Sequence, residues 1–447
     1  MQKILLFGAG KSATVLINYL LATAVEENWQ ITIADADLVL AQSKTGNSAF
    51  AKAISFDINN ALERNKAIQD ADIVISLLPP ALHFLVAQDC VLFSKNLLTA
   101  SYVDDKIKSL KTDIEKKGLL FLCEMGLDPG IDHMSAMKII DSIHAKGGVV
   151  TSFKSHCGGL VAPESDNNPW HYKISWNPRN IVLAGKAGAT FKKDGKKVEV
   201  LYDKIFENCP EIHVKNLPVF AAYPNRDSVS YAVLYGLEES STFIRTTLRY
   251  ASFCRGWDVI CHLGLTDTDD EKEISHLQTI GQWFHFKLKG IELKELSWLD
   301  YLKRYVDEEW HTELTEQIDF LDLLEEHKIP VDAKCSADIL QSLLEKRLVL
   351  NKEDKDMIVM LHEIESKAGN IESGVKSVLI VKGEDSLKTA MAKTVGLPIG
   401  IAAKLILQKQ IQLTGLHIPV LKEIYEPVLK ELETHGIRFS EEEIVLS

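Results

Sequence analysis

The feature that most constrains this chain is a glycine-rich turn, GAGKSA at residues 8–13, between an apolar run and a segment with helical spacing. It fits the pattern G-x-G-x-x-A, in which Gly8 makes a tight turn, Gly10 lets the backbone approach a pyrophosphate, and Ala13 allows close helix packing. The apolar run at 3–7 has the length of a strand. The sequence therefore predicts a strand, a turn and a helix whose N-terminus binds a dinucleotide.

Lys11 and Ser12 raise a second interpretation, because Gly-Lys-Ser also ends the P-loop pattern G-x-x-x-x-G-K-[ST]. That pattern requires a further glycine at position 5, where the chain has Leu5. The turn therefore favours a dinucleotide, and we expect Lys11 to be a loop side chain near the pyrophosphate.

Short apolar runs alternate with helical segments through residues 1–125, which is typical of a parallel, doubly wound sheet of the Rossmann type. The run at 73–78 is followed by two prolines, which cannot donate to a continuing strand ladder. We expect the end of this strand to face the cofactor crevice. Further predicted strands cover residues 31–34, 53–56, 97–100 and 119–123.

Two acidic residues, Asp35 and Asp37, follow the second predicted strand, about where an acid binds the adenosine ribose of NAD. A carboxylate there can accept both ribose hydroxyl protons, but it repels the 2′-phosphate of NADP. The alternative is that the aspartates only cap the next helix. Because the segment 35–37 contains no arginine or lysine, we expect NAD to be preferred and NADP to be the less favoured cofactor.

Differences in residue content along the chain predict an α/β protein with three regions. Residues 1–125 together with 386–447 are predicted to form the Rossmann-type dinucleotide-binding domain. Residues 126–265 together with 353–385 are rich in glycine-, proline- and aromatic-containing loops and are predicted to form an α+β substrate-binding domain. Residues 266–352 are dense in Leu, Glu, Lys and Trp at helical spacing, which predicts a helical insertion.

Charge and cysteine content restrict the class of protein. The net charge of -13 argues against nucleic acid or an anionic membrane as the main partner. The seven cysteines include no C-x-x-C pair, which argues against a disulfide framework and a zinc knuckle. We expect a cytoplasmic enzyme that acts on a small molecule and has no metal site, no nucleic-acid partner and no membrane association.

Six motifs occur in order along the chain: TASYVDD, EMGLDPGIDHM, CGGL, YKISWNP, AYPNRDS and TLRY. Together they resemble the saccharopine dehydrogenases that form glutamate, although no motif anchors residues 266–352. The resemblance implies a nicotinamide-dependent oxidoreductase of the lysine and 2-aminoadipate pathway. Such an enzyme interconverts saccharopine with 2-aminoadipate 6-semialdehyde and glutamate, and a homodimer formed through the second domain is expected.

The resemblance also implies a substrate site. Saccharopine carries three carboxylates, which guanidinium groups bind through paired hydrogen bonds, and two arginines, Arg226 and Arg249, match the family's substrate-binding arginines. The alternative is that both arginines form ordinary surface salt bridges. The implied substrate-binding residues are Ser101, Tyr102, Asp128, Arg226, Thr247, Leu248 and Arg249.

The implied cofactor-binding residues come mostly from turns that follow the predicted strands. Trp176 resembles a tryptophan that lies beside the cofactor, although its position also fits a core aromatic residue. The full set is Gly8, Gly10, Lys11, Ser12, Ala13, Asp35, Ala36, Asp37, Asp57, Ile58, Leu77, Leu78, Ala100, Ser101, Leu127, Asp128, Pro129 and Trp176.

Tyr102, Asp128 and Cys157 are the catalytic candidates that the resemblance implies, because the reaction moves protons at the amine and at the carbinolamine. Asp128 also fits a turn-forming aspartate, and Cys157 also fits a small buried apolar side chain. The sequence assigns no general base. Three histidines near the motifs are expected to be structural hydrogen-bonding groups: His133, His156 and His171.

An alternative function is that of a carboxynorspermidine-type reductase, which acts on an imine built from a polyamine. Its substrate has fewer carboxylates, so the pair Arg226 and Arg249 favours saccharopine. A non-enzymatic paralogue would lack these arginines or Asp128, and the chain contains all three. The sequence leaves open whether the reaction serves the synthesis or the breakdown of lysine.

Overall fold

The computed structural model describes residues 1–292 and 295–445. Within these residues the chain forms two compact units, and each is treated separately. The sequence predicted three regions, which is a finer division than these two units, and that division remains a prediction. Positions 293–294 and 446–447 of the predicted regions lie outside the described residues. Unit 1 is Met1–Val150, Ser366–Ser373 and Leu379–Ser447, and unit 2 is Thr151–Glu365 and Gly374–Val378.

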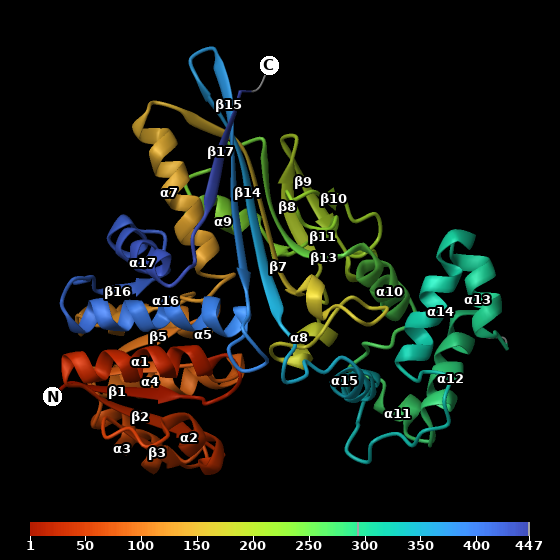
Figure 1. Cartoon of the computed structure of the whole chain (residues 1–447), viewed down its shortest axis with the longest axis horizontal. Coiled ribbons are helices and arrows are strands. Elements are labelled where there is room, and N and C mark those ends of the chain that lie inside the picture. The colour runs from red at the N-terminus through yellow and green to blue at the C-terminus, as the bar shows by residue number, and fades with distance from the viewer. Residues whose placement is uncertain (293–294, 446–447) are drawn as a thin grey trace. The chain divides into compact units, whose positions relative to one another are not determined.

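Unit 1 contains a parallel sheet (Figure 1). Its strands are β1 (Lys3–Phe7), β2 (Gln30–Asp35), β3 (Ala51–Ser55), β4 (Ile73–Ser76), β5 (Asn96–Thr99), β6 (Leu120–Leu122) and β16 (Gly415–His417). The strand order is β16-β6-β5-β4-β1-β2-β3, so the direction of winding reverses between β1 and β4. This is the order of a doubly wound dinucleotide-binding fold, and it confirms the predicted Rossmann-type domain.

Both faces of this sheet are covered. Successive residues of β1 from Ile4 to Phe7 are at most 1% exposed, although their side chains point alternately to opposite faces. A strand buried on both faces requires helices on both sides, as parallel sheets do. The helices of unit 1 are α1 (Ala13–Glu27), α2 (Leu38–Thr45), α3 (Ala61–Gln69), α4 (His83–Leu92), α5 (Asp105–Ser109), α6 (Lys111–Lys116), α7 (Ile131–Ala145), α16 (Ala390–Leu407) and α17 (Lys422–Thr434).

Helix α16 returns from late in the sequence to pack beside α1 (Figure 1). Gly396 permits this approach, because a Cβ at this position would lie 2.9 Å from the backbone nitrogen of Leu16. Among the described helices, α16 is the one long and apolar enough to cross a membrane, and 72% of it is buried inside the protein. A helix in the core of a folded domain has the same length, apolar composition and burial as α16.

The second sheet is mixed. Its strands are β7 (Val149–Val161), β8 (Ala189–Lys193), β9 (Lys196–Val200), β10 (Glu211–Ile212), β11 (Phe220–Pro224), β12 (Arg226–Asp227), β13 (Thr242–Tyr250), β14 (Asp356–Ala368), β15 (Ile371–Lys382) and β17 (Ser440–Val445). The strand β13 pairs in parallel with β7 and antiparallel with β11, and the shorter strands β8, β9 and β12 extend from β13. Helices on a sheet that mixes both strand directions confirm the predicted α+β class.

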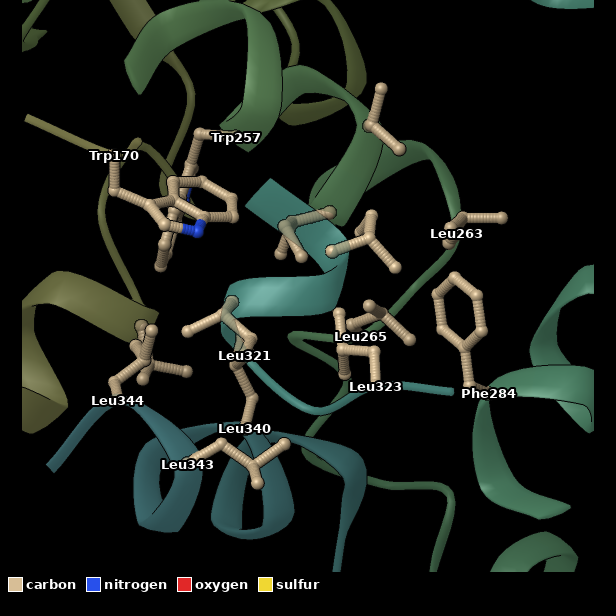
Figure 2. Close-up of a cluster of buried hydrophobic side chains, with 14 of the residues drawn as sticks. Trp170, Trp257, Leu263, Leu265, Phe284, Leu321, Leu323, Leu340, Leu343 and Leu344 are labelled. Atoms are coloured by element: carbon tan, nitrogen blue, oxygen red, sulfur yellow. The ribbon is translucent and has the colours of Figure 1, made fainter. Parts of the chain in front are cut away.

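The helical part of unit 2 has a core of large apolar side chains. Trp170, Trp257, Phe284 and Leu340 are fully buried in it, and Figure 2 shows them packed among leucines. The helices of unit 2 are α8 (Pro178–Val182), α9 (Val229–Leu234), α10 (Ala251–His262), α11 (Glu271–Ile274), α12 (Ile280–Glu292), α13 (Trp298–Tyr305), α14 (His311–Phe320) and α15 (Ser336–Arg347). Helices α11 to α15 confirm the helical character predicted for this part of the chain.

Candidate functional site

The turn between β1 and α1 leaves room for a ligand phosphate. Gly8 has a φ of +99°, and a Cβ there would lie 2.9 Å from the carbonyl oxygen of Leu77. At Gly10, in contrast, a Cβ would meet no atom within 4 Å. Ala13 is buried where α1 begins. The open space at Gly10 lies beside the N-terminus of α1, and helix N-termini of this kind bind phosphate groups.

Asp35 is bonded to the backbone of this turn. Its Oδ2 accepts a hydrogen bond from Ala9 N at 2.7 Å, and its Oδ1 accepts one from Asp37 N at 2.9 Å. Asp37 caps α2, since its Oδ1 accepts a hydrogen bond from Leu40 N at 3.0 Å. Ala36 lies between the two acidic residues. Both carboxylates therefore have backbone partners, and Asp35 fixes the end of β2 to the glycine turn.

Other predicted cofactor residues lie in the loops that follow the strands of unit 1. Lys11 is exposed, and Ser12 precedes α1 without a capping bond from its side chain. Leu77 and Leu78 follow β4, where Leu77 N donates to Phe7 O at 2.9 Å. These residues lie at the carboxyl edge of the sheet, where doubly wound folds bind ligands.

Asp57 and Ile58 follow β3 at the same edge. The side chain of Asp57 accepts from Asn59 N at 2.9 Å, and the carbonyl of Ile58 accepts from the guanidinium of Arg64. Their polar groups thus shape the loop after β3.

Ala100 and Ser101 follow β5, where the structure reveals a histidine contact that the sequence did not predict. The hydroxyl of Ser101 lies 2.7 Å from Nε2 of His83, and Nδ1 of His83 lies 2.8 Å from the hydroxyl of Ser76. Burial lowers the pKa of His83 to about 4. The sequence signal for His83 is its place shortly after Pro79 and Pro80, which gives no hint of a partner 18 residues away.

A buried polar network joins the loops after β5 and β6. Glu124 accepts from Val103 N at 3.1 Å and lies 2.9 Å from Nε2 of His133, whose Nδ1 is 3.6 Å from Asp132. Glu124, Asp132 and His133 are all at most 3% exposed. Tyr102 precedes Val103, so the network holds the loop that carries this catalytic candidate.

Leu127, Asp128 and Pro129 lie in a tight loop after β6. Gly130 has a φ of +147°, and a Cβ there would overlap the backbone of Gly126. The loop therefore requires glycine, and it places Asp128 at the carboxyl edge of the sheet, in the same unit as Ser101 and Tyr102.

Three of the predicted residues in unit 2 share one face of the second sheet. Cys157 on β7 is the cross-strand partner of Thr247 on β13, and Thr247 is also opposite Tyr223 on β11. Because side chains alternate along a strand, Arg249 points to the same face as Thr247. Cys157 is 6% exposed and Arg249 is 5% exposed. This face places a thiol, hydroxyls and a guanidinium close together.

Arg249 is a buried cation with an incomplete set of partners. Its Nη1 donates to Leu248 O at 2.8 Å and lies 3.4 Å from Gly159 O, and the guanidinium lies over the rings of Tyr172 and Phe253. Its Nε has no hydrogen-bond partner. Among the described residues no carboxylate forms an ion pair with it. A buried guanidinium in this state suits an anionic ligand.

The remaining predicted residues of unit 2 lie elsewhere. The side chain of Leu248 points to the opposite face and belongs to an apolar cluster, so a ligand on the face of Arg249 would meet its backbone only. Arg226 is exposed, has a φ of +48°, and is paired with Ala189 across β12 and β8. Trp176 is partly buried, and its Nε1 lies 3.4 Å from the hydroxyl of Tyr172.

The structural roles expected for His156 and His171 agree with their contacts. Nδ1 of His156 lies 2.7 Å from the hydroxyl of Thr246. Nδ1 of His171 lies 2.6 Å from Asp166, and this hydrogen bond raises the pKa of His171. The segment 166–171 borders a cavity of about 720 Å³ in unit 2, and none of the predicted substrate or cofactor residues lines it.

Comparison with known proteins assigns the family. Residues 4–122 match the saccharopine dehydrogenase NADP binding domain, and residues 126–437 match the saccharopine dehydrogenase C-terminal domain. The chain belongs to the saccharopine dehydrogenase family. This result confirms the family that the six motifs indicated.

Relatives of the saccharopine dehydrogenase family match along the whole chain. Saccharopine dehydrogenase (NADP(+), L-glutamate-forming) of Saccharomyces cerevisiae is 33% identical over 450 residues. The alignment covers 99% of this chain and 99% of the yeast protein. The solved structure of apo histidine-tagged saccharopine dehydrogenase (L-Glu forming) from the same yeast has a TM-score of 0.88 at 31% identity, with full coverage of both chains.

Another relative is longer. Alpha-aminoadipic semialdehyde synthase of Arabidopsis thaliana is 34% identical over 440 residues, which are 93% of this chain and 41% of the synthase. This chain therefore spans less than half the length of that relative.

The expected preference for NAD is wrong. The yeast relative is named for NADP(+), and the matching domain is described as an NADP binding domain. The prediction assumed that the Asp35 carboxylate faces the ribose and repels a 2′-phosphate. In the structure its two oxygen atoms accept hydrogen bonds from Ala9 N and Asp37 N, so the acid supports the turn.

Proposed function

We propose that this protein catalyses the NADP-dependent oxidation of saccharopine to 2-aminoadipate 6-semialdehyde and glutamate, or the reverse reaction. The observation that carries the proposal is the environment of Arg249. Its guanidinium is buried, its Nε has no hydrogen-bond partner, and no carboxylate among the described residues forms an ion pair with it. A substrate with three carboxylates supplies the missing anion. The name of the yeast relative, which is similar over nearly the full chain, supports the same substrate and cofactor.

The reaction needs a hydride acceptor, proton transfers and water. When bound, NADP⁺ would supply the nicotinamide ring as the hydride acceptor for the carbon beside the secondary amine of saccharopine. Water then adds to the resulting imine, and the carbinolamine breaks down to the semialdehyde and glutamate. Overall, saccharopine, NADP⁺ and water give the semialdehyde, glutamate, NADPH and a proton.

The residues of the chain position these reactants. The turn at Gly8 and Gly10 and the N-terminus of α1 would hold the pyrophosphate. Arg249, together with Arg226, would bind substrate carboxylates. Tyr102, Asp128 and Cys157 remain the groups proposed to lie near the reacting atoms, and no single general base is assigned to the proton transfers.

The location and assembly of the protein are also proposed. We expect a homodimer in the cytoplasm that acts on these small molecules, without nucleic acid or a membrane, as the family resemblance and the charge suggest. Sedimentation of the purified protein tests the dimer, since a monomer over the working concentration range would contradict it.

The activity is tested by following the absorbance of reduced nicotinamide. The purified protein is given saccharopine with NADP⁺ or with NAD⁺, and separately NADPH with a polyamine imine. We expect NADPH formation from saccharopine above the control without enzyme. Oxidation of NADPH by the polyamine imine, with no reaction of saccharopine, would instead identify a carboxynorspermidine-type reductase.

A further inference from the structure

We propose that His83 is a positioning residue that holds the hydroxyl of Ser101 as a hydrogen-bond donor toward an oxygen atom of the bound ligand. The acceptor is a carboxylate oxygen of the substrate or an amide or phosphate oxygen of the cofactor. This inference rests on the proposed function, because Ser101 is one of the predicted substrate- and cofactor-binding residues.

Neighbouring strands bring the three side chains together in unit 1. Ser76 is the last residue of β4 and pairs with Thr99, the last residue of β5, two positions before Ser101. His83 begins α4 and lies between the two hydroxyls, 2.8 Å from Ser76 and 2.7 Å from Ser101. Because β4 and β5 are parallel, both serines lie at the carboxyl edge of the sheet, which is the ligand-binding edge in this fold.

The hydrogen-bond requirements of Ser76 fix the position of the imidazole proton. The serine is fully buried, and among the described residues Nδ1 of His83 is the partner of its hydroxyl. A buried hydroxyl that donates to nothing is unfavourable, so Ser76 donates to Nδ1, which must be unprotonated. His83 is 5% exposed and is neutral near pH 7, so its one proton is on Nε2. His83 therefore donates to Ser101.

The remaining polar groups of Ser101 are also fixed. Its N–H donates to the hydroxyl of Thr99 at 3.2 Å, and its carbonyl accepts from Glu124 N at 3.1 Å. The Oγ of Ser101 accepts the hydrogen bond from Nε2 of His83, so the hydroxyl proton of Ser101 takes no part in this contact. No other described residue takes up that proton, and Ser101 is only partly buried. The hydroxyl is thus held in place with its donor available to a ligand oxygen.

Two substitutions of His83 separate positioning from general support of the fold. In His83→Asn the side-chain oxygen replaces Nδ1 and still accepts from Ser76, but the side chain is too short to reach Ser101. In His83→Gln the amide nitrogen replaces Nε2 and still donates to Ser101, while the contact with Ser76 is lost. Ser101→Ala removes the hydroxyl itself. Thr23→Val, which removes a buried hydroxyl bond to Tyr19 O far along α1, is the control.

We expect kcat/KM to fall about tenfold in His83→Asn and in Ser101→Ala, as loss of one ligand hydrogen bond predicts. His83→Gln should stay within about threefold of the wild type, since it restores the donor. Adding His83→Asn to Ser101→Ala should cause no further loss, because the two residues act through one bond. Thr23→Val should lower the melting temperature without changing kcat/KM.

The kinetic constants identify the ligand oxygen. A higher KM for saccharopine alone assigns it to the substrate, and a higher KM for NADP⁺ alone assigns it to the cofactor. Equal losses in the Asn and Gln variants, or losses that add in the double variant, would overturn the inference.

A nitrogen NMR spectrum of the labelled imidazole provides a test that needs no turnover. The inference predicts a neutral ring protonated at Nε2, whose signal shifts in Ser101→Ala. A ring protonated at Nδ1 would overturn the inference whether or not saccharopine is a substrate. An inactive wild type with the predicted ring signals would contradict only the proposed function.

Discussion

Arg249 is the residue whose surroundings carry most information about the substrate. We predict that Arg249→Lys raises the KM for saccharopine, because lysine keeps the charge but loses the paired hydrogen bonds. Loss of one charge-assisted bond costs about 1.5–3 kcal/mol, which is roughly tenfold to a hundredfold in KM. Steady-state kinetics should show little change in the KM for NADP⁺.

Arg255→Lys is the matched control for this prediction. Arg255 forms a two-pronged ion pair with Glu313, at 2.9 and 2.8 Å, so its guanidinium already has an acid partner within the protein. The control should leave the KM for saccharopine unchanged. A folded Arg249→Lys variant with the KM of the wild type would place Arg249 outside the substrate site.

Cys157 is close to Thr247 on the same sheet face, but the proposed reaction requires no thiolate nucleophile. We therefore predict that Cys157→Ser keeps substantial activity, within about tenfold of the wild type, since serine retains a small polar side chain. Turnover of the purified variant checks this prediction. If the variant binds saccharopine but has no turnover, the thiol takes part in the chemistry.

Sequence patterns predicted some of these residues and missed others for a physical reason. The glycine turn depends on the backbone near each glycine, so its pattern is visible locally. The contacts of Asp35 with Ala9 and of His83 with Ser101 join separate loops, and they depend on which strands are neighbours. That is why the role of Asp35 was misjudged and His83 was not recognised.

The strand, turn and helix formed by β1 and α1 are the element that the dinucleotide site depends on, and two glycines allow it to be tested. We predict that Gly10→Ala leaves stability nearly unchanged, because the added methyl group meets no protein atom within 4 Å. The same methyl group should weaken binding of NADP⁺, because it fills the space proposed for the pyrophosphate. Gly8→Ala should lower stability by about 1 kcal/mol or more, because of its positive φ and close contact with Leu77. Melting temperatures and nucleotide titrations measure both effects.

The opposite pattern would contradict this account of the turn. If Gly10→Ala bound NADP⁺ as tightly as the wild type, the pyrophosphate would not approach the backbone at this glycine. If Gly8→Ala melted at the wild-type temperature, the tight turn would not require glycine.

At the level of elements, short local patterns placed the strands well and their ends less well. The predicted strand 97–100 corresponds to Asn96–Thr99, and the predicted strand 73–78 ends earlier, at Ser76. In the hairpin of β14 and β15, the eight residues KAGNIESG at 367–374 have the composition of a loop, but β14 ends at Ala368 and β15 begins at Ile371. Polar residues that continue a hairpin beyond its buried part resemble a loop in the sequence.

The stability of the folded molecule should depend on pH through Glu363. Close contacts with two basic side chains lower the pKa of Glu363 from 4.5 to about 2: Nε2 of His156 lies 3.4 Å from the carboxylate, and Nζ of Lys376 lies 2.9 Å from it. A lowered pKa means that the ionised carboxylate stabilises the folded state above pH 4.5 and that this contribution disappears as the pH falls from 4.5 to about 2. We predict that Glu363→Gln lowers the free energy of unfolding at neutral pH and that the difference from the wild type shrinks in this window.

Denaturant unfolding at several pH values measures this difference. Glu239→Gln, at an exposed position, is the control and should show no such change with pH. A stability difference for Glu363→Gln that stays constant from neutral pH down to pH 2 would contradict the assigned role of the carboxylate.

For the whole molecule, the sequence predicted the Rossmann-type sheet because alternating strands and helices have few possible arrangements. It did not predict that β16 joins this sheet next to β6, since a three-residue strand has no recognisable pattern of its own. The prediction of the family from the sequence depended on six motifs spread over the chain, and the comparisons confirmed it. Motifs identify a reaction more reliably than they identify the atoms that distinguish NAD from NADP.

The most direct test of the central claim is the product ratio of the reaction. Purified protein is incubated with saccharopine and NADP⁺, and glutamate, the semialdehyde and NADPH are measured in the same sample. We predict that the three products appear in equal amounts and that Arg249→Lys lowers all three together at low saccharopine concentration. NADPH without glutamate, or no NADPH from saccharopine in a folded and NADP⁺-binding protein, would contradict the claim that this chain is a glutamate-forming saccharopine dehydrogenase.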